Sequence, residues 1–285
     1  MPRPNRRAVR VAALALALWC GALTPLRAQA PDTARAPLVP FFTRSDAVLA
    51  AGFAVGAVGF AQLDRRLAHA FQDPGLQEST AVGWASDFFN WMGDPGIPVL
   101  GVALFAVGRV THDRPIAALG LHGIEGVLLG SAITGTIKGV AGRARPYVHV
   151  DTVPDDFKLF RGFSNGTAYE SFPSGHTTGA FAAAAVATAE VVHWTEVKGW
   201  WPGWPYVTGT ALFGGATLVG LARMYRDQHW ASDVVAGAAI GTFSGLEVVK
   251  YAYRHPRSRL ERWLLPRAVV PEGGGALRVV WSVPD

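Results

Sequence analysis

Two long apolar segments flank the polar stretch Ala222-Arg223-Met224-Tyr225-Arg226-Asp227-Gln228-His229-Trp230-Ala231-Ser232-Asp233. His229 and Asp233 are four residues apart, so on a helix they share a face and can touch. A carboxylate there can accept the proton of one imidazole nitrogen and leave the other nitrogen free to attack. Arg223 offers a planar guanidinium suited to a phosphate. Taken alone, the stretch fits a solvated ion pair at a helix corner equally well.

Two further clusters carry cations and a second histidine. In Lys138-Gly-Val-Ala-Gly-Arg-Ala-Arg145-Pro146, the two numbered cations are seven residues apart, so both could project from one helix face before the proline ends it. In Pro173-Ser174-Gly175-His176, Ser174 is suited to cap the helix that follows, and the free N–H groups of a helix N-terminus bind anions. Taken singly, the cations also fit a basic helix edge, and His176 fits a polar helix start.

The three clusters together, Lys-x6-Arg-Pro, Pro-Ser-Gly-His and Arg-x5-His-x3-Asp in that order, form a specific combination. They resemble the motifs of the phosphatidic acid phosphatase type 2 / vanadium haloperoxidase superfamily, and the resemblance spans roughly Asp46 to Tyr253. The family's third motif usually begins Ser-Arg, whereas this chain has Ala222, which bears on phosphate affinity more than on catalysis.

The resemblance implies a role for each matching residue. His229 would be the nucleophile, Asp233 would orient it, and His176 would be the general acid for the leaving group. The phosphate oxygens would be held by the remaining matched residues: Lys138, Arg145, Ser174, Gly175 (through its N–H) and Arg223. Three fixed cations and a helix N-terminus can stabilise a phosphate without a metal, so we expect no metal and no cofactor. Vanadate is expected to act as an inhibitor.

Composition favours a helical, largely apolar chain. The 285 residues are 50% hydrophobic and 16% charged, with 33 glycines and a mean hydropathy of +0.21. These values exclude a disordered chain and suit one helical domain. The net charge of +5 and a pI near 9.7 would permit nucleic-acid binding, but the basic residues form no stripe. An anionic substrate and anionic lipid explain the charge, so we expect no nucleic-acid partner.

The N-terminus is typical of an export signal. Four arginines precede an apolar run, and Ala28-Gln29-Ala30 supplies a small-x-small cleavage site. Cleavage after that site would remove Cys20, the single cysteine, and with it any disulfide or thiolate chemistry. An uncleaved anchor is the alternative. We predict a signal peptide at 1–30, a linker at 31–44, a helical phosphatase domain at 45–255 and a basic C-terminal tail at 256–285.

Six apolar segments predict the fold. They are approximately Asp46–Leu63, Gly96–Val110, Pro115–Ile137, Thr177–Val192, Tyr206–Ala222 and Asp233–Tyr253. The first motif ends the third segment, the second begins the fourth, and the third connects the fifth and sixth. Consecutive helices that run up and down therefore place all three motifs at one end. We predict an all-α bundle of about six core helices, embedded in a membrane, with the motifs at that end.

Two connecting stretches also carry expectations. Residues 79–92 contain several aromatic side chains and suit either an interfacial helix or a core-packing one. The stretch from Tyr147 to Phe172 is expected to be a loop over the motif end that affects substrate choice.

The direction of the bundle in the membrane is ambiguous in the sequence. Basic residues of the tail and of the turn at Arg109–Arg114 lie opposite the motifs, so the positive-inside rule places the motifs on the outer face. A cleaved signal followed by six spans would place them inside instead. We expect an exported protein, either in an inner membrane of bacterial type with its site facing the periplasm or peripheral in the periplasm, and leave the number of spans open.

The leading hypothesis is a metal-independent phosphatase that hydrolyses lipid-linked phosphate monoesters or diphosphates through a phosphohistidine. One alternative is an exported, non-specific acid phosphatase on soluble phosphomonoesters. Others are a vanadate-dependent haloperoxidase, with vanadate as cofactor, and a catalytically weak anion-binding protein, which Ala222 would permit. A phosphotransferase is a variant of the first. The sequence has no Gly-x4-Gly-Lys-Ser/Thr loop and no His-Glu-x-x-His motif, and its aspartates are too scattered to predict a metal site.

Overall fold

The computed structural model describes residues 43–255 and residue 264. Contacts divide the chain into two units, residues 1–50 and residues 51–285. The described part of the first unit is the start of α2 (Arg44–Ala61), where Thr43 Oγ1 accepts from Asp46 N at 3.3 Å and caps the helix. The predicted signal peptide, nearly all of the linker and the basic tail apart from Leu264 lie outside the described residues.

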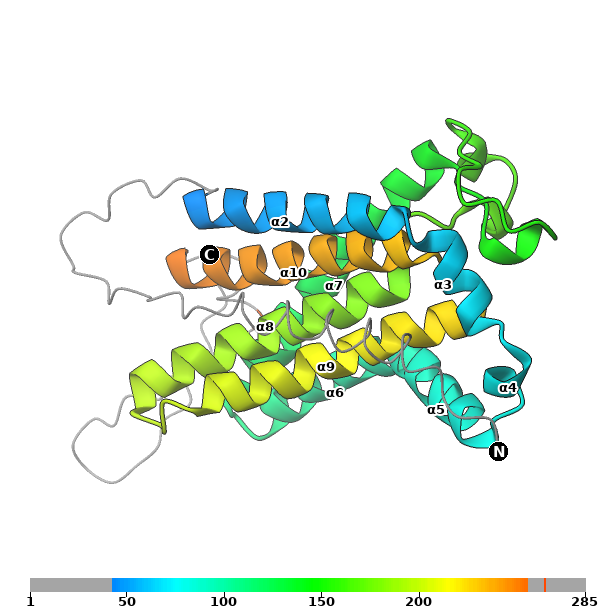
Figure 1. The fold of residues 1–285 in the computed structure, drawn as a ribbon. Coiled ribbons are helices and arrows are strands. Elements are labelled where there is room, and N and C mark those ends of the chain that lie inside the picture. Colours follow the sequence, from blue (N-terminus) through cyan, green and yellow to red (C-terminus); the bar gives the residue numbers. More distant parts are fainter. Residues whose placement is uncertain (1–42, 256–263, 265–285) are drawn as a thin grey trace, which may run out of the picture. The chain divides into compact units, whose positions relative to one another are not determined.

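The regular elements of the second unit are helices (Figure 1). After α2 come α3 (Asp64–Phe71), α4 (Pro74–Gln77), α5 (Thr80–Trp91), the turn η1 (Met92–Gly96), α6 (Ile97–Val110), α7 (Arg114–Ala141), α8 (Gly175–Lys198), α9 (Trp204–Tyr225) and α10 (Ala231–Arg254). Each of the six predicted segments coincides with a helix, so the all-α fold class is confirmed. The short helices α3 and α4 were not predicted.

Helix α7 shows how local sequence sets the bounds of an element. Asp113 caps its start by accepting from Ile116 N at 3.1 Å. Gly142 ends it in the left-handed region, at φ 53°, where a Cβ would lie 2.1 Å from the Lys158 carbonyl oxygen. Arg145 therefore lies beyond the helix. The predicted placement of Lys138 and Arg145 two turns apart on one helix is wrong.

Helix α8 is the centre of the second unit and packs against α7, α9 and α10. Its first half is built from small residues that are buried nearly throughout. A row of glycines on α10 meets it: a Cβ on Gly237, Gly241 or Gly245 would lie 2.2–2.5 Å from a carbonyl oxygen of α8 or of its cap. Contact between small residues lets two helix backbones approach closely, as in membrane bundles. The start of α8 is thereby held against the start of α10.

Four helical stretches in the described part of the chain are long and apolar enough to cross a membrane. They are Thr80–Val110, Arg114–Ala141, Trp204–Tyr225 and Ala231–Arg254, with a fifth if the bent pair α2 and α3 counts as one span. Of the six predicted apolar segments, those that form α2 and α8 are not among these four stretches. By length and composition, these helices are those of an integral membrane protein.

Helix α5 presents aromatic side chains to its surroundings. Trp84, Phe88 and Trp91 are 76%, 55% and 53% exposed. A core-packing helix would bury these rings, so the core-packing alternative does not describe α5, and the interfacial interpretation stays a prediction.

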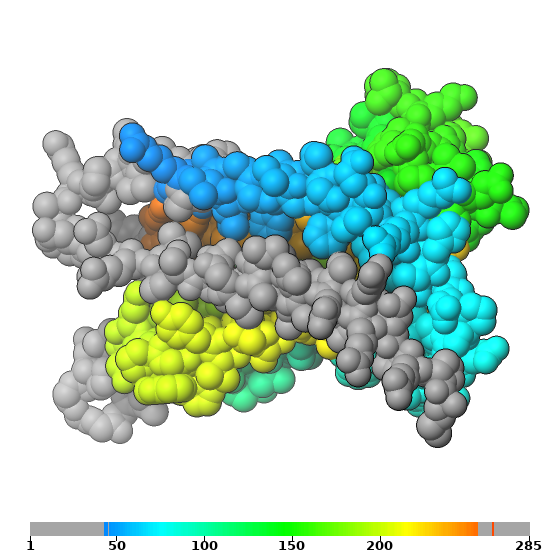
Figure 2. Space-filling view, viewed as in Figure 1, coloured from blue at the N-terminus to red at the C-terminus, as the bar shows by residue number. Residues whose placement is uncertain are grey.

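The segment between α7 and α8 is the green lobe at the upper right of Figure 2, and Figure 1 shows it beyond the end of these two helices. It contains three short 3-10 turns: η2 (Pro146–Val148), η3 (Arg161–Phe163) and η4 (Thr167–Tyr169). Turn η3 lies against α7, because a Cβ on Gly162 would stand 2.3 Å from the Lys138 carbonyl oxygen. The expected loop at the motif end is confirmed.

Candidate active site

The three motifs meet at one end of the second unit, as the order of the helices predicted. The first lies at the end of α7, the second at the start of α8, and the third on the turn between α9 and α10. Coulombic interactions link Lys138 with Arg145 and Arg223, and all three cations act on His176. The residues expected to surround a phosphate are therefore neighbours in space.

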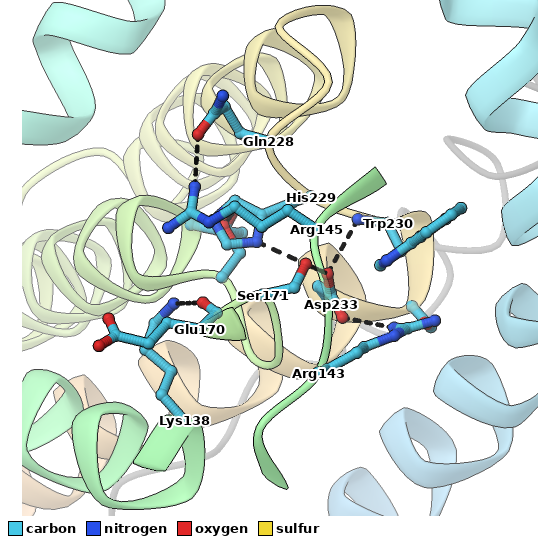
Figure 3. A network of polar contacts seen from close by, with 12 residues as sticks. Lys138, Arg143, Arg145, Glu170, Ser171, Gln228, His229, Trp230 and Asp233 are labelled. Carbon is cyan, nitrogen blue, oxygen red and sulfur yellow. Dashed lines mark hydrogen bonds and ion pairs between the residues drawn. The ribbon is translucent and has the colours of Figure 1, made fainter. Parts of the chain in front are cut away.

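Asp233 is the centre of the polar network in Figure 3. Its Oδ1 accepts from Arg143 Nη1 at 2.5 Å, and its Oδ2 accepts from Ser171 Oγ at 2.5 Å and from Trp230 N at 2.9 Å. The carboxylate is fully buried. An ionised carboxylate in a buried site requires such donors, so these contacts keep Asp233 charged and fixed.

His229 faces this carboxylate from the turn that precedes α10. Its Nδ1 lies 3.6 Å from Asp233 Oδ2, slightly beyond hydrogen-bond length, and its side chain is 2% exposed. The prediction that the two residues share a helix face is wrong, because α10 begins at Ala231. The predicted proximity nevertheless holds, since the turn folds back over the first residues of the helix. An ionised Asp233 favours the proton on Nδ1, which leaves a lone pair on Nε2.

Arg143 connects Asp233 to a second buried carboxylate. Its Nη2 donates to Asp64 Oδ2 at 2.7 Å, and Asp64 also accepts from Ser232 N at 2.8 Å. The guanidinium lies over the rings of Phe157 and Trp230. Arg143 and Asp64 were not among the predicted site residues, although Arg143 stands inside the first motif.

The three cations of the site are each tethered by an oxygen. Lys138 Nζ donates to the Glu170 carbonyl, and Arg145 donates to the Thr167 carbonyl at 2.8 Å and to Gln228 Oε1 at 2.5 Å. Carbonyl and amide oxygens orient these cations without neutralising them. The positive charge is thus left available for an anion.

Arg223 is held from the opposite side by α5. It is 8% exposed and donates through Nη1 to Asn90 Oδ1, while its Nε has no hydrogen-bond partner in the described part of the chain. On the same helix, Ser86 Oγ lies 3.5 Å from the Ala222 carbonyl oxygen. Helix α5 therefore supports the position at which the family motif was expected to carry serine.

The second motif forms the start of α8. Ser174 occupies the N-cap position as predicted, but its side chain makes no capping hydrogen bond. Instead, Ser174 Oγ accepts from Thr177 Oγ1 at 2.9 Å, so its own proton stays available to donate. His176 packs closely on η1, since a Cβ on Gly93 would lie 3.1 Å from its ring. Gly175 is the first residue of α8, where a backbone N–H is free of intrahelical bonding.

Among residues 43–255, no group of three or more His, Cys, Asp and Glu side chains is placed to hold a metal ion. Metal independence stays a prediction.

Comparison with known proteins identifies the segment that carries this site. Residues 120–257 match the model of the PAP2 superfamily. These residues form a PAP2-superfamily domain. The match begins in α7 and includes all three motifs, which confirms the expected family.

Curated relatives of this PAP2 domain include two lipid A 1-phosphatases. That of Porphyromonas gingivalis is 40% identical over 81 residues, 28% of this chain and 16% of the relative. That of Rhizobium etli is 32% identical over 143 residues, 48% of this chain and 52% of the relative. The chain thus spans about half or less of the length of these relatives. A solved structure of LpxE from Aquifex aeolicus is similar with a TM-score of 0.46 and 21% identity, covering 66% of this chain and 96% of that one.

Proposed function

We propose that this protein is a metal-independent phosphatase that removes phosphate from a lipid-linked phosphate monoester or diphosphate through a phosphohistidine. The observation that carries the proposal is the buried Asp233, which faces His229 Nδ1 while three tethered cations stand nearby. An activated nitrogen nucleophile beside the cationic cradle formed by Lys138, Arg145 and Arg223 suits phosphoryl transfer.

The proposed reaction has two steps, formation of the phosphohistidine and its hydrolysis. His229 Nε2 attacks phosphorus while Lys138, Arg145, Arg223, Ser174 Oγ and the Gly175 N–H hold the non-bridging oxygens. The bond from phosphorus to the leaving oxygen breaks, and His176 donates a proton to that oxygen. Burial and the nearby cations lower the pKa of His176 to about 3 in the free protein, so the negative charge of the bound phosphate has to raise that pKa for the donation. Asp233 stabilises the imidazolium that develops on His229. Water then attacks the phosphohistidine while His176 takes a proton from it. The bond from phosphorus to Nε2 breaks, phosphate leaves, and both histidines return to their starting states.

A lipid substrate is supported by the surroundings of the site. Membrane-length helices lead directly to it, and α5 exposes aromatic side chains beside it. Relatives bear the name lipid A 1-phosphatase, so the 1-phosphate of lipid A is the first substrate to test.

The test is phosphate release by the purified protein in detergent with EDTA, comparing lipid A 1-phosphate and phosphatidic acid with a soluble aryl phosphate. Release from a lipid that vanadate inhibits is expected. Preference for the aryl ester would establish a non-specific acid phosphatase instead. Complete dependence on an added divalent metal would contradict the mechanism.

Burial of His229 gives a prediction for the pH dependence. Burial lowers the pKa of His229 to about 3, against the opposing effect of Asp233. The nucleophile is therefore neutral at every pH well above 3 and is not lost between pH 7 and pH 4. Any acid limb of kcat/KM in that range should follow the second phosphate pKa across a series of aryl phosphates. A limb fixed near pH 6.5, the ordinary histidine value, would contradict this.

Replacement of Asn90 by alanine tests the tether on Arg223. A hydrogen bond to a charged group contributes about 1.5–3 kcal/mol, so we expect KM to rise roughly 10-fold or more as Arg223 loses its orientation. Asp87→Ala is the matched control, because Asp87 lies one turn earlier on α5 and pairs with Arg226 near the surface. Equal kinetics of the two variants would exclude the tether.

We further propose that the site faces the periplasm. The turn that contains Arg109 and Arg114 joins α6 to α7 at the end opposite the motifs, in agreement with a cytoplasmic location of that end. Single cysteines introduced at Ser164 and Thr111 in a Cys20→Ser chain test this with a membrane-impermeant maleimide on intact cells. Labelling at residue 164 alone is expected, and labelling at residue 111 alone would reverse the orientation.

A further inference from the structure

A second polar site lies at the opposite end of the helices from the candidate active site. A cavity of about 290 Å³ is lined by residues of α7, α8 and α10, among them His122, His193 and Tyr253. On α7, His122 is 16 residues before Lys138, which places the two ends about 24 Å apart along the helix. None of the three motifs reaches this cavity.

A buried hydrogen-bonded chain forms one side of the cavity. His122 Nδ1 lies 2.6 Å from Glu190 Oε1, and Tyr253 Oη donates to Glu190 Oε2 at 2.7 Å. Glu190 is 0% and His122 2% exposed. A neutral His122 that donates to Glu190 carries its proton on Nδ1. Ionisable groups within apolar helices are costly and usually functional.

The opposite nitrogen of His122 has no such partner. Nε2 is buried and lacks a hydrogen bond in the described part of the chain. With the proton on Nδ1, Nε2 is an unpaired acceptor on a side chain that lines the cavity. A buried polar atom left unpaired is destabilising, so a ligand that supplies an O–H or N–H would be favoured there.

Cations stand at the mouth of the same cavity. Arg114 and Lys198 both line it and are exposed, and Lys198 Nζ lies 5.8 Å from the ring centre of Trp194, another lining residue. The described residues that line the cavity include these two cations and no carboxylate, so its lining is positive. The rest of its wall is mainly apolar, with Pro115, Ala118 and Val197.

We propose that this cavity binds the headgroup of an anionic phospholipid in which a phosphate diester carries a hydroxyl group, as in a phosphoglycerol headgroup. The phosphate would lie between Arg114 and Lys198, and the hydroxyl would donate to His122 Nε2. The volume admits a headgroup and not the acyl chains, which would remain outside among lipids. A zwitterionic headgroup would bring an ammonium to a site that is already positive. The lipid would come from the leaflet opposite the candidate active site.

The cations are tested by counting bound lipid on the purified full chain with native mass spectrometry, in neutral detergent with vanadate present. We expect phosphatidylglycerol to bind more tightly than phosphatidylethanolamine or diacylglycerol. The double variant Arg114→Gln, Lys198→Gln should weaken that binding about 10-fold or more. Arg109→Gln is the matched control, because Arg109 is a cation near the same turn and does not line the cavity. Equal binding by the double variant and the control would overturn the proposal.

The role of His122 Nε2 as an acceptor is tested with phosphatidylmethanol, which lacks the headgroup hydroxyl. Phosphatidylmethanol has the same charge as phosphatidylglycerol but no hydroxyl, so wild type should bind it about 5-fold more weakly, as expected for one hydrogen bond. His122→Asn keeps a donor near the position of Nδ1 and removes Nε2, so it should bind the two lipids equally. No discrimination by wild type would refute the role of His122.

Binding of water-soluble glycerophosphoglycerol distinguishes a membrane lipid from a soluble phosphodiester as the ligand of this cavity. Weak binding compared with phosphatidylglycerol identifies a membrane lipid as the ligand. Equally tight binding assigns the cavity to a soluble phosphodiester with the same contacts. Both results are independent of phosphatase activity, so failure of the proposed reaction leaves this site standing.

Discussion

Replacement of His229 by alanine is expected to abolish turnover, with a loss of at least about 1,000-fold in kcat. Asp233 faces Nδ1 of this imidazole, which leaves Nε2 to form the covalent bond to phosphorus. Removal of its ring leaves the cations in place, so vanadate should still bind. Phosphate release and vanadate affinity, measured on the same preparation, separate loss of chemistry from loss of the cradle.

The matched control for this variant is His69→Ala. His69 is exposed on α3 and belongs to none of the three motifs. It should retain wild-type activity. Trapping of labelled phosphate on acid-quenched wild-type protein, but not on His229→Ala, would demonstrate the phosphohistidine. Appreciable turnover by His229→Ala would exclude His229 as nucleophile.

Arg143→Met should be the most destabilising change near the site. It leaves Asp64 and Asp233 buried without their shared cation, and breaking such a pair costs about 3–5 kcal/mol. The freed Asp233 would also lose its fixed orientation toward His229. We expect a large fall in the thermal midpoint and, in the protein that remains folded, a fall in kcat of roughly 100-fold.

Two conservative variants sharpen this test. Arg143→Lys retains the charge but cannot donate to both carboxylates at once, so kcat should fall even where folding is restored. Arg226→Lys is the control: Arg226 pairs with the exposed Asp87, and such surface pairs contribute about 1 kcal/mol or less. An Arg143→Lys protein with full activity would show that the bridge is dispensable.

The helices were predictable because their ends carry local signals. The segment predicted at Gly96–Val110 is α6 at Ile97–Val110, since an apolar run is enclosed between a Gly-Pro turn and a polar corner. Helices α3 and α4 were not predictable because they are short. Helix α3 also carries charged residues, whereas an apolar run is the sequence signal for a helix. The third predicted segment, which forms α7, was expected to end at Ile137, whereas Gly142 ends the helix after Ala141.

The candidate site was predictable only where a motif names its residues. The motifs supplied the histidines, Asp233 and the cations, and the structure brings these together. The partners that hold them are 79 residues away for Asp64 and Arg143, and 133 for Asn90 and Arg223, so no local pattern connects them. A signal for the second cavity did exist, because His122 and Glu190 interrupt apolar segments. Their pairing required the fold.

The bond between Asp64 and Ser232 joins residues that are 168 positions apart, from α3 to the first turn of α10. During synthesis, Arg143 emerges before the second of its two carboxylates exists, and the carboxylate that faces His229 arrives with the last described helix. A nascent or truncated chain that lacks α10 therefore holds the cations and His229 without the carboxylate that orients the nucleophile. On the proposed mechanism, hydrolysis would begin only after α10 has folded against the rest of the site.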